Sequence, residues 1–108
     1  MRVVIVGAGE VGSSIAASLC ADHEVVVVDR DSDRVESLTY SLDVLPVEGD
    51  GASLETLTEA SVGDADMVIA CTDNDETNIV ACGPVKTISE AFTIARVRNT
   101  NYLDTRNN

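Results

Sequence analysis

The chain has 108 residues, of which 44% are hydrophobic but only 3% aromatic, so it is long enough for one domain with an aliphatic core. Its net charge of −12 disfavours nucleic acid and anionic membrane surfaces as direct partners. No apolar run approaches the roughly 18 residues that cross a bilayer, so we expect no direct membrane insertion.

The charge and the cysteines indicate the environment in which the protein works. The acidity is either a functional patch or a means of solvation in a cytoplasm rich in salt. Acidic residues are spread along the chain and Lys86 is the single lysine, which favours salt adaptation. The three cysteines lack the spacing of a metal site, and their odd number indicates reduced thiols in the cytosol.

The chain begins with an apolar run, a glycine-rich turn and a helix. Residues 2–6 are apolar and mostly β-branched, residues 7–12 read G-x-G-x-x-G, and residues 13–19 have the pattern of a helix. This order is the dinucleotide-binding fingerprint, in which the helix N-terminus faces the phosphates of the ligand. The candidate cofactor-binding residues of the turn are Gly7, Ala8, Gly9, Glu10, Val11 and Gly12.

A second strand, over residues 24–29, ends in the acidic residue Asp29. This residue lies 20 positions after Gly9, where a ribose-binding carboxylate belongs. A carboxylate there accepts hydrogen bonds from the ribose hydroxyls and repels a 2′-phosphate, which favours NAD(H) over NADP(H). The alternative interpretation is a glycine turn that only connects a strand to a helix.

The next segment predicts a helix over residues 33–40, which either Asp31 or Ser32 can cap. Arg30 precedes this cap and follows the strand directly. It either lies over the adenine, meets a phosphate, or is simply solvated.

Three aspartates in this segment, Asp29, Asp31 and Asp33, resemble the start of a calcium-binding loop. The position of the loop glycine holds Arg34, and the position of the bidentate glutamate holds Tyr40. We therefore predict no metal site here.

A short third strand is expected over residues 44–47, and Pro46 favours an edge position because proline has no backbone N–H to donate. A glycine-rich turn then leads to a helix over residues 53–60. Asp50 in this turn either caps the helix or reaches the adenosine of a ligand, since the turn lies at the carboxyl end of a strand.

The second half of the predicted site follows two later strands. A buried strand over residues 66–71 leads to Thr72 and Asp73, which we expect beside the glycine turn, across the point where the strand order reverses. A fifth strand is expected over residues 92–97. Arg96 near its end should lie within reach of the ligand.

Between these strands the sequence predicts an interrupted helix. Asp73 and Glu76 have the spacing of a capping box, and the helix continues over residues 77–82. Gly83 and Pro84 then predict a kink or a break, because proline lacks an N–H and crowds the preceding turn.

The alternation of strands and helices predicts an α/β fold. We expect a Rossmann-like doubly wound parallel sheet of order 3-2-1-4-5 in three layers, α/β/α, truncated before a final strand. Residues 99–103 should begin another helix. No residue set has the pattern of a nucleophile–base pair, so we predict no catalytic residue.

Several segments of the chain resemble a known family. They are residues 4–12, 28–29, 48–51, 65–70, 72–78 and 94–99, in that order. Together they are similar to the N-terminal nucleotide-binding domain of Trk-type potassium-uptake regulatory subunits, also called the RCK, KTN or TrkA-N domain. The D-E-T-N and A-R-V-R-N segments are more specific than the glycine turn alone.

The resemblance implies a cytoplasmic regulatory subunit at the inner face of the membrane. It would bind a membrane-embedded Trk-type potassium transporter and gate it in response to NAD(H), ATP or ADP. The intact protein would be a homo-oligomer, and residues 1–108 would be its nucleotide-binding domain, as a fragment or a short variant. Gly83 and Pro84 depart from the unbroken helix that the family has at this place.

The same resemblance implies roles for individual residues. The glycine turn would hold phosphates, Asp29 would bind the ribose, and Asp50 would lie near the adenosine. Thr72 and Asp73 would line the second half of the site. Arg96 would reach a phosphate or the distal nucleotide.

Two other functions share parts of this pattern. The cofactor-binding domain of an NAD-dependent dehydrogenase, separated from its catalytic domain, shares the glycine turn and Asp29 but does not explain residues 73–78 or 96–98. A domain kept only for contact with other proteins would leave the cleft empty.

Overall fold

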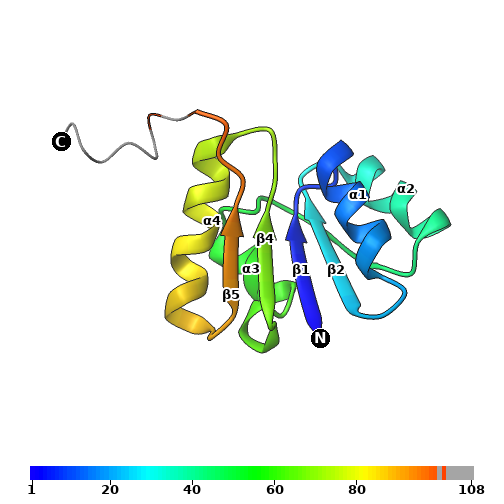
Figure 1. Ribbon diagram of the computed structural model, residues 1–108, viewed down its shortest axis with the longest axis horizontal. Coiled ribbons are helices and arrows are strands. Elements are labelled where there is room, and N and C mark those ends of the chain that lie inside the picture. The colour runs from blue at the N-terminus through cyan, green and yellow to red at the C-terminus, as the bar shows by residue number, and fades with distance from the viewer. Residues whose placement is uncertain (100, 102–108) are drawn as a thin grey trace.

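Five parallel strands form one sheet, in the order β3-β2-β1-β4-β5, in the computed structural model, which describes residues 1–99 and 101 (Figure 1). The strands are β1 (Arg2–Val6), β2 (Glu24–Asp29), β3 (Leu45–Glu48), β4 (Met67–Ala70) and β5 (Phe92–Ala95). The helices are α1 (Glu10–Leu19), α2 (Ser32–Ser41), α3 (Leu54–Glu59) and α4 (Asp75–Ile88), with a 3₁₀ turn η1 (Val62–Asp64) before β4. The predicted fold class and strand order are confirmed.

Helices cover both faces of the sheet. α1 and α2 pack on one face through Ala16 and Val35. α3 and α4 pack on the other face through Leu57, Ala81 and Val85. The fold therefore has the three layers that the sequence predicts. Within the described part of the chain, no helix has the length and apolar character needed to span a membrane.

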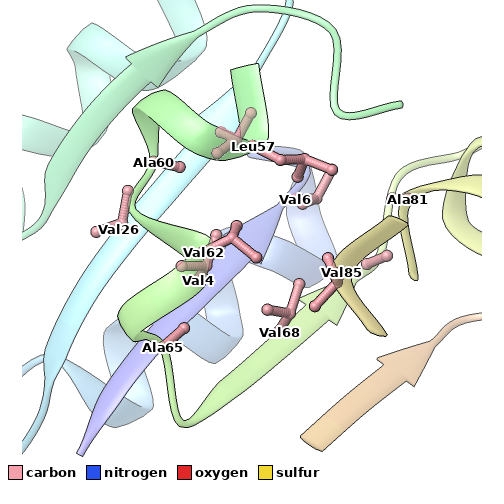
Figure 2. Packing of buried hydrophobic residues seen from close by; sticks show 12 residues of the cluster. Val4, Val6, Val26, Leu57, Ala60, Val62, Ala65, Val68, Ala81 and Val85 are labelled. Atoms are coloured by element: carbon pink, nitrogen blue, oxygen red, sulfur yellow. The ribbon is translucent and has the colours of Figure 1, made fainter. Parts of the chain in front are cut away.

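The central strand β1 is buried on both sides, which explains why its sequence is a continuous apolar run rather than an alternating one. Val4 and Val6 point into the cluster formed with α3 and α4. Val3 and Ile5 point into the cluster formed with α1 and α2. Figure 2 shows the first cluster, in which Val6 of β1 lies beside Leu57 of α3, and Val68 of β4 lies beside Val85 of α4.

The two neighbours of β1 fix the place where a ligand can bind. Val6 aligns with Val28 of β2 on one side and with Ala70 of β4 on the other. The carboxyl ends of these three strands therefore lie at one edge of the sheet. The strand order reverses at β1, and ligands of open α/β sheets bind at that point.

The predicted capping box at the start of α4 is wrong by one residue. Asn74 is the N-cap, and its side chain accepts a hydrogen bond from the backbone N–H of Thr77 at 2.9 Å. Asp73 lies one position outside the helix, and its carboxylate pairs with Arg96 instead. Asn and Asp are equally good N-caps, so spacing to Glu76 alone did not identify the cap.

The predicted interruption at Gly83 and Pro84 is also wrong, because α4 continues past both residues to Ile88. Pro84 removes the N–H that would bond to the carbonyl of Val80, one turn earlier. Val80 is half exposed, so water can satisfy that carbonyl. The buried side chain of Val85 lies directly after the proline and anchors the second half of the helix to the core.

Most other element boundaries agree closely with the predictions, but α1 begins at Glu10, three residues before the predicted start. Asp31 caps α2 by accepting hydrogen bonds from the N–H groups of Asp33 and Arg34. β3 is an edge strand that contains Pro46, as predicted. β5 is shorter than predicted and ends at Ala95. The helix predicted over residues 99–103 falls mostly outside the described residues.

The continuity of α4 can be tested with Gly83→Ala. Outside its own helix and its chain neighbours, a Cβ at this position would meet no atom of the described residues within 4 Å, and alanine favours a helix interior over glycine. We expect the free energy of unfolding, measured by urea denaturation, to rise by about 0.5–1 kcal/mol. A decrease would indicate that Gly83 adopts a backbone conformation that alanine cannot, as a broken helix would require.

Candidate functional site

A cavity of about 270 Å³ opens at the carboxyl edge of the sheet. Residues at or just after the carboxyl end of each of the five strands line this cavity. The cavity therefore lies where the strand order reverses. Its lining consists of Val6, Gly7, Gly9, Glu10, Val11, Val28, Asp29, Arg30, Arg34, Gly49, Gly51, Cys71, Thr72, Asp73, Asn74, Thr77 and Arg96.

The glycine turn forms the floor of the cavity. Gly7 has a φ of 115°, and a Cβ there would lie 2.9 Å from the backbone nitrogen of Thr72, so both conformation and space require glycine. Gly9 is the N-cap of α1 and provides no side chain to cap it. The first N–H groups of α1 therefore face the cavity without partners inside the helix, which is the arrangement that binds anions.

The carboxylate of Asp29 is fixed at the end of β2. One oxygen, Oδ2, accepts a hydrogen bond from the N–H of Ala8 at 2.7 Å, and the other, Oδ1, accepts one from the N–H of Asp31 at 2.8 Å. A carboxylate has about four acceptor positions, so two remain for the hydroxyls of a ligand. The sequence predicted the position of Asp29 but not its contact with the glycine turn.

The other side of the cavity is organised by Asn78, which is fully buried on α4. Its Oδ1 accepts hydrogen bonds from the N–H of Thr72 at 2.8 Å and from the Thr72 hydroxyl at 2.7 Å. Its Nδ2 donates to the carbonyls of Thr72 at 3.1 Å and Arg96 at 2.9 Å. Asn78 therefore joins the ends of β4 and β5. Asn78 lies on the same helix face as Ala81 and Val85, and this spacing in the sequence could have predicted that its side chain is buried.

Arg96 and Asp73 face each other at the mouth of the cavity, with Arg96 Nη1 3.8 Å from Asp73 Oδ1. Cys71 lies deeper and is buried. Burial raises the pKa of its thiol, and the positive charge of Arg96 opposes this only in part. The thiol is therefore protonated at neutral pH, and Cys71 is a wall of the cavity rather than a nucleophile.

Most of the predicted site residues line this cavity. Ala8, Gly12 and Asp50 do not: Ala8 is buried beneath the turn, and Gly12 packs against the carbonyl of Gly7. Of the two alternatives for Asp50, the one in which it caps α3 is wrong, since Ser53 is the N-cap. The Asp50 carboxylate accepts a hydrogen bond from the N–H of Ala52 at 2.9 Å and so shapes the turn.

Three polar residues line the cavity that sequence reasoning did not select. They are Arg34 in the first turn of α2, and Asn74 and Thr77 at the start of α4. Helices that follow parallel strands begin at the ligand edge of the sheet. The first turns of α2 and α4 could therefore have been selected from the sequence as parts of the site.

Charges of both signs line the cavity, in equal number, although the chain as a whole is strongly acidic. Arg30, Arg34 and Arg96 all line it, which is three of the seven basic residues of a chain whose net charge is −12. Glu10, Asp29 and Asp73 also line it. Among the described residues, no group of His, Cys, Asp or Glu has the geometry to hold a metal ion. The arrangement suits a ligand that carries both hydroxyl and anionic groups.

Comparison with known proteins gives matches over nearly the whole chain. The family model of the TrkA-N domain matches residues 3–107. The Trk system potassium uptake protein TrkA homolog of Archaeoglobus fulgidus is 39% identical over 104 residues, which cover 96% of this chain and 24% of that protein. The chain thus spans about a quarter of the length of the curated relatives that it matches.

Solved structures give the same fold. The TrkA-N domain of the inner membrane protein ybaL from Escherichia coli has a TM-score of 0.84 and 25% identity, covering 93% of this chain and 75% of that one. The Kef CTD of Shewanella denitrificans, solved in an AMP-bound form, has a TM-score of 0.81 and 18% identity, covering 94% and 62%.

Two glycines of the turn should respond differently to alanine. In Gly12→Ala the new Cβ would overlap the carbonyl oxygen of Gly7, so we expect a loss of about 2–3 kcal/mol in unfolding free energy. In Gly9→Ala the nearest contact is the end of the Arg34 side chain at 3.5 Å, so we expect a loss below about 1 kcal/mol, from the poorer N-cap. Equal losses in urea denaturation would contradict this geometry.

The raised pKa of Cys71 predicts its reactivity. Alkylation of Cys71 by iodoacetamide at pH 8, followed by peptide mass spectrometry, should be about tenfold or more slower than in the urea-unfolded protein. Its rate should still increase as the pH rises through 9, because the thiolate forms only at high pH. A rate that levels off below pH 8 would indicate a stabilised thiolate and contradict the prediction.

Proposed function

The chain belongs to the TrkA-N domain family, and we propose that it senses an adenine nucleotide for a regulatory subunit that gates potassium uptake. In this proposal residues 1–108 are one nucleotide-binding domain. Its ligand is NAD(H), with ATP or ADP binding in the same cleft. The domain acts without catalysis.

One observation carries the proposal: the Asp29 carboxylate is fixed beside the open N-terminus of α1 by its bond to Ala8. A nucleotide presents both hydroxyl groups and phosphates. The free acceptor positions of Asp29 suit the ribose, and the unpartnered N–H groups suit the phosphates. The negative charge of Asp29 disfavours a 2′-phosphate, which supports NAD(H) over NADP(H).

The printed names of the relatives support the wider role. The Archaeoglobus relative is named as a Trk potassium uptake protein, and the Kef structure holds AMP. By analogy, the partner of this domain is a membrane-embedded Trk-type potassium transporter subunit. The domain then works in the cytoplasm at the inner face of the membrane, as part of a homo-oligomer.

The contacts at the mouth of the cleft suggest how binding is transmitted. Arg96 is paired with Asp73, a largely exposed residue, so a phosphate can compete for its guanidinium. The main-chain carbonyl of Asp73 accepts a hydrogen bond from Arg98. Asp75 also holds this segment, by accepting hydrogen bonds from the N–H groups of Arg98 at 3.0 Å and Asn99 at 2.7 Å. A ligand on Arg96 thus acts on the segment that contains Arg98 and Asn99.

Isothermal titration with NADH, NAD, ATP and ADP tests the proposal. We expect Asp29→Asn to weaken binding about tenfold or more, because it removes a charged acceptor of the ribose hydroxyls. Asp43→Ala, which removes the same charge from an exposed residue outside the cavity, should have little effect. NADPH should bind more weakly than NADH.

The titration also has clear negative outcomes. Failure of the wild-type protein to bind any of these ligands at millimolar concentration would refute nucleotide sensing. Binding that Asp29→Asn leaves unchanged would refute the assigned site. Hydride exchange between bound NAD and a small substrate would favour the dehydrogenase alternative.

A further inference from the structure

The aspartate-rich segment that resembles a calcium loop has another use in the structure. Asp29 Oδ1 accepts a hydrogen bond from the N–H of Asp31. Asp31 Oδ1 in turn accepts hydrogen bonds from the N–H groups of Asp33 at 3.0 Å and Arg34 at 3.4 Å. The aspartates therefore form the end of β2 and the cap of α2, and this connected series leads to Arg34.

The guanidinium of Arg34 lies over the glycine turn. Among the described residues other than Gly9 and its chain neighbours, only Arg34 Nη1 lies within 4 Å of the position that a Gly9 Cβ would occupy, at 3.5 Å. Gly9 is the residue at which the fingerprint lets a pyrophosphate come closest to the backbone. Arg34 also lines the cavity, although α2 is not the helix of the glycine turn.

Most of the hydrogen-bonding capacity of Arg34 is free for a ligand. Its Nε lies 3.7 Å from Asp31 Oδ2, and both side chains are half exposed, so this pair is weak but orients the guanidinium. Among the described residues, none accepts a hydrogen bond from its Nη1 or Nη2. These two nitrogens form the fork with which arginine binds two phosphate oxygens.

We propose that Arg34 binds the 5′-phosphate groups of the nucleotide, opposite the N–H groups at the start of α1. This inference rests on the proposed nucleotide-sensing function and assigns that site a residue from a second helix. Asp29 only accepts hydrogen bonds and takes the hydroxyls, whereas Arg34 only donates and takes the anionic oxygens. Arg34 therefore increases the affinity for phosphorylated nucleosides but not for adenosine itself.

Titration of the Arg34→Gln variant tests this assignment. Loss of one charged contact should weaken the binding of ADP and NADH about tenfold. Arg34→Lys keeps the charge but loses the forked geometry of the guanidinium, so its affinity should lie between those of Arg34→Gln and wild type. The affinity for adenosine, measured by ligand-observed NMR, should change less than about twofold. The matched control is Lys86→Gln, which makes the same charge change on α4 outside the cavity and should bind ADP like wild type.

Each other outcome overturns the proposal in a recognisable way. Equal ADP affinity in Arg34→Gln and Lys86→Gln would show that Arg34 does not contact the phosphates. An equal loss for adenosine would place Arg34 on the base or in the fold. A loss confined to NADPH would assign it to a 2′-phosphate. Absence of nucleotide binding in the wild-type protein would refute the sensing function and this inference together.

Discussion

The hydrogen bond from the Ala8 N–H to the Asp29 carboxylate is the interaction on which the site depends. Together with the backbone bond from the Gly7 N–H to the Val28 carbonyl, it joins the turn after β1 to the end of β2. A hydrogen bond to a charged group in a partly buried place contributes about 1.5–3 kcal/mol. The same carboxylate orients the Asp31 N–H, so the phosphate side and the α2 side of the cavity share one anchor. Because both of its oxygens accept hydrogen bonds, the Asp29 carboxylate cannot rotate freely. It is therefore already oriented for ligand hydroxyls before a ligand binds.

The charge of the protein sets a second constraint. A net charge of −12 repels a nucleotide at long range, while the three arginines that line the cavity attract it at short range. At physiological salt the Debye length is about 8 Å, so salt screens distant acidic residues more than groups in direct contact. Moderate salt therefore removes repulsion before it weakens the contacts. This is compatible with the hypothesis of salt adaptation, under which the acidic surface would cost little affinity in a cytoplasm rich in salt.

The sequence predicted those features that a single local pattern determines. The apolar runs of β1 and β2, the glycine turn and the edge position of Pro46 each follow from residue type and spacing. Contacts between distant segments were not predictable in this way. Arg34 reads as an ordinary solvated residue of α2 until the fold brings that helix over Gly9. Asn78 reads as one polar residue among several until β4 and β5 are placed side by side.

The errors have the same origin. Local chemistry at Pro84 favours a broken helix, because one backbone hydrogen bond is lost. Packing reverses this preference: Ala81 and Val85 are fully buried on either side of the proline, and their burial outweighs one unmade bond at a hydrated carbonyl. The cap of α4 was likewise misassigned from local spacing: Asn74 accepts the hydrogen bond from the Thr77 N–H, whereas Asp73 faces Arg96.

The strength of the contacts at the cleft mouth limits what a bound nucleotide can do. An exposed ion pair contributes about 0–1 kcal/mol, so exchange of Asp73 for a phosphate on Arg96 shifts an equilibrium only a few-fold. The Asp75 contacts add to this, since the N–H groups of Arg98 and then Asn99 lower the pKa of its carboxyl. A lowered pKa means that the stabilisation is complete above the unfolded pKa and is lost as the pH falls through the folded one. At neutral pH Asp75 is ionised and holds the main chain at Arg98 and Asn99. A large response therefore requires that the ligand displace several of these contacts together.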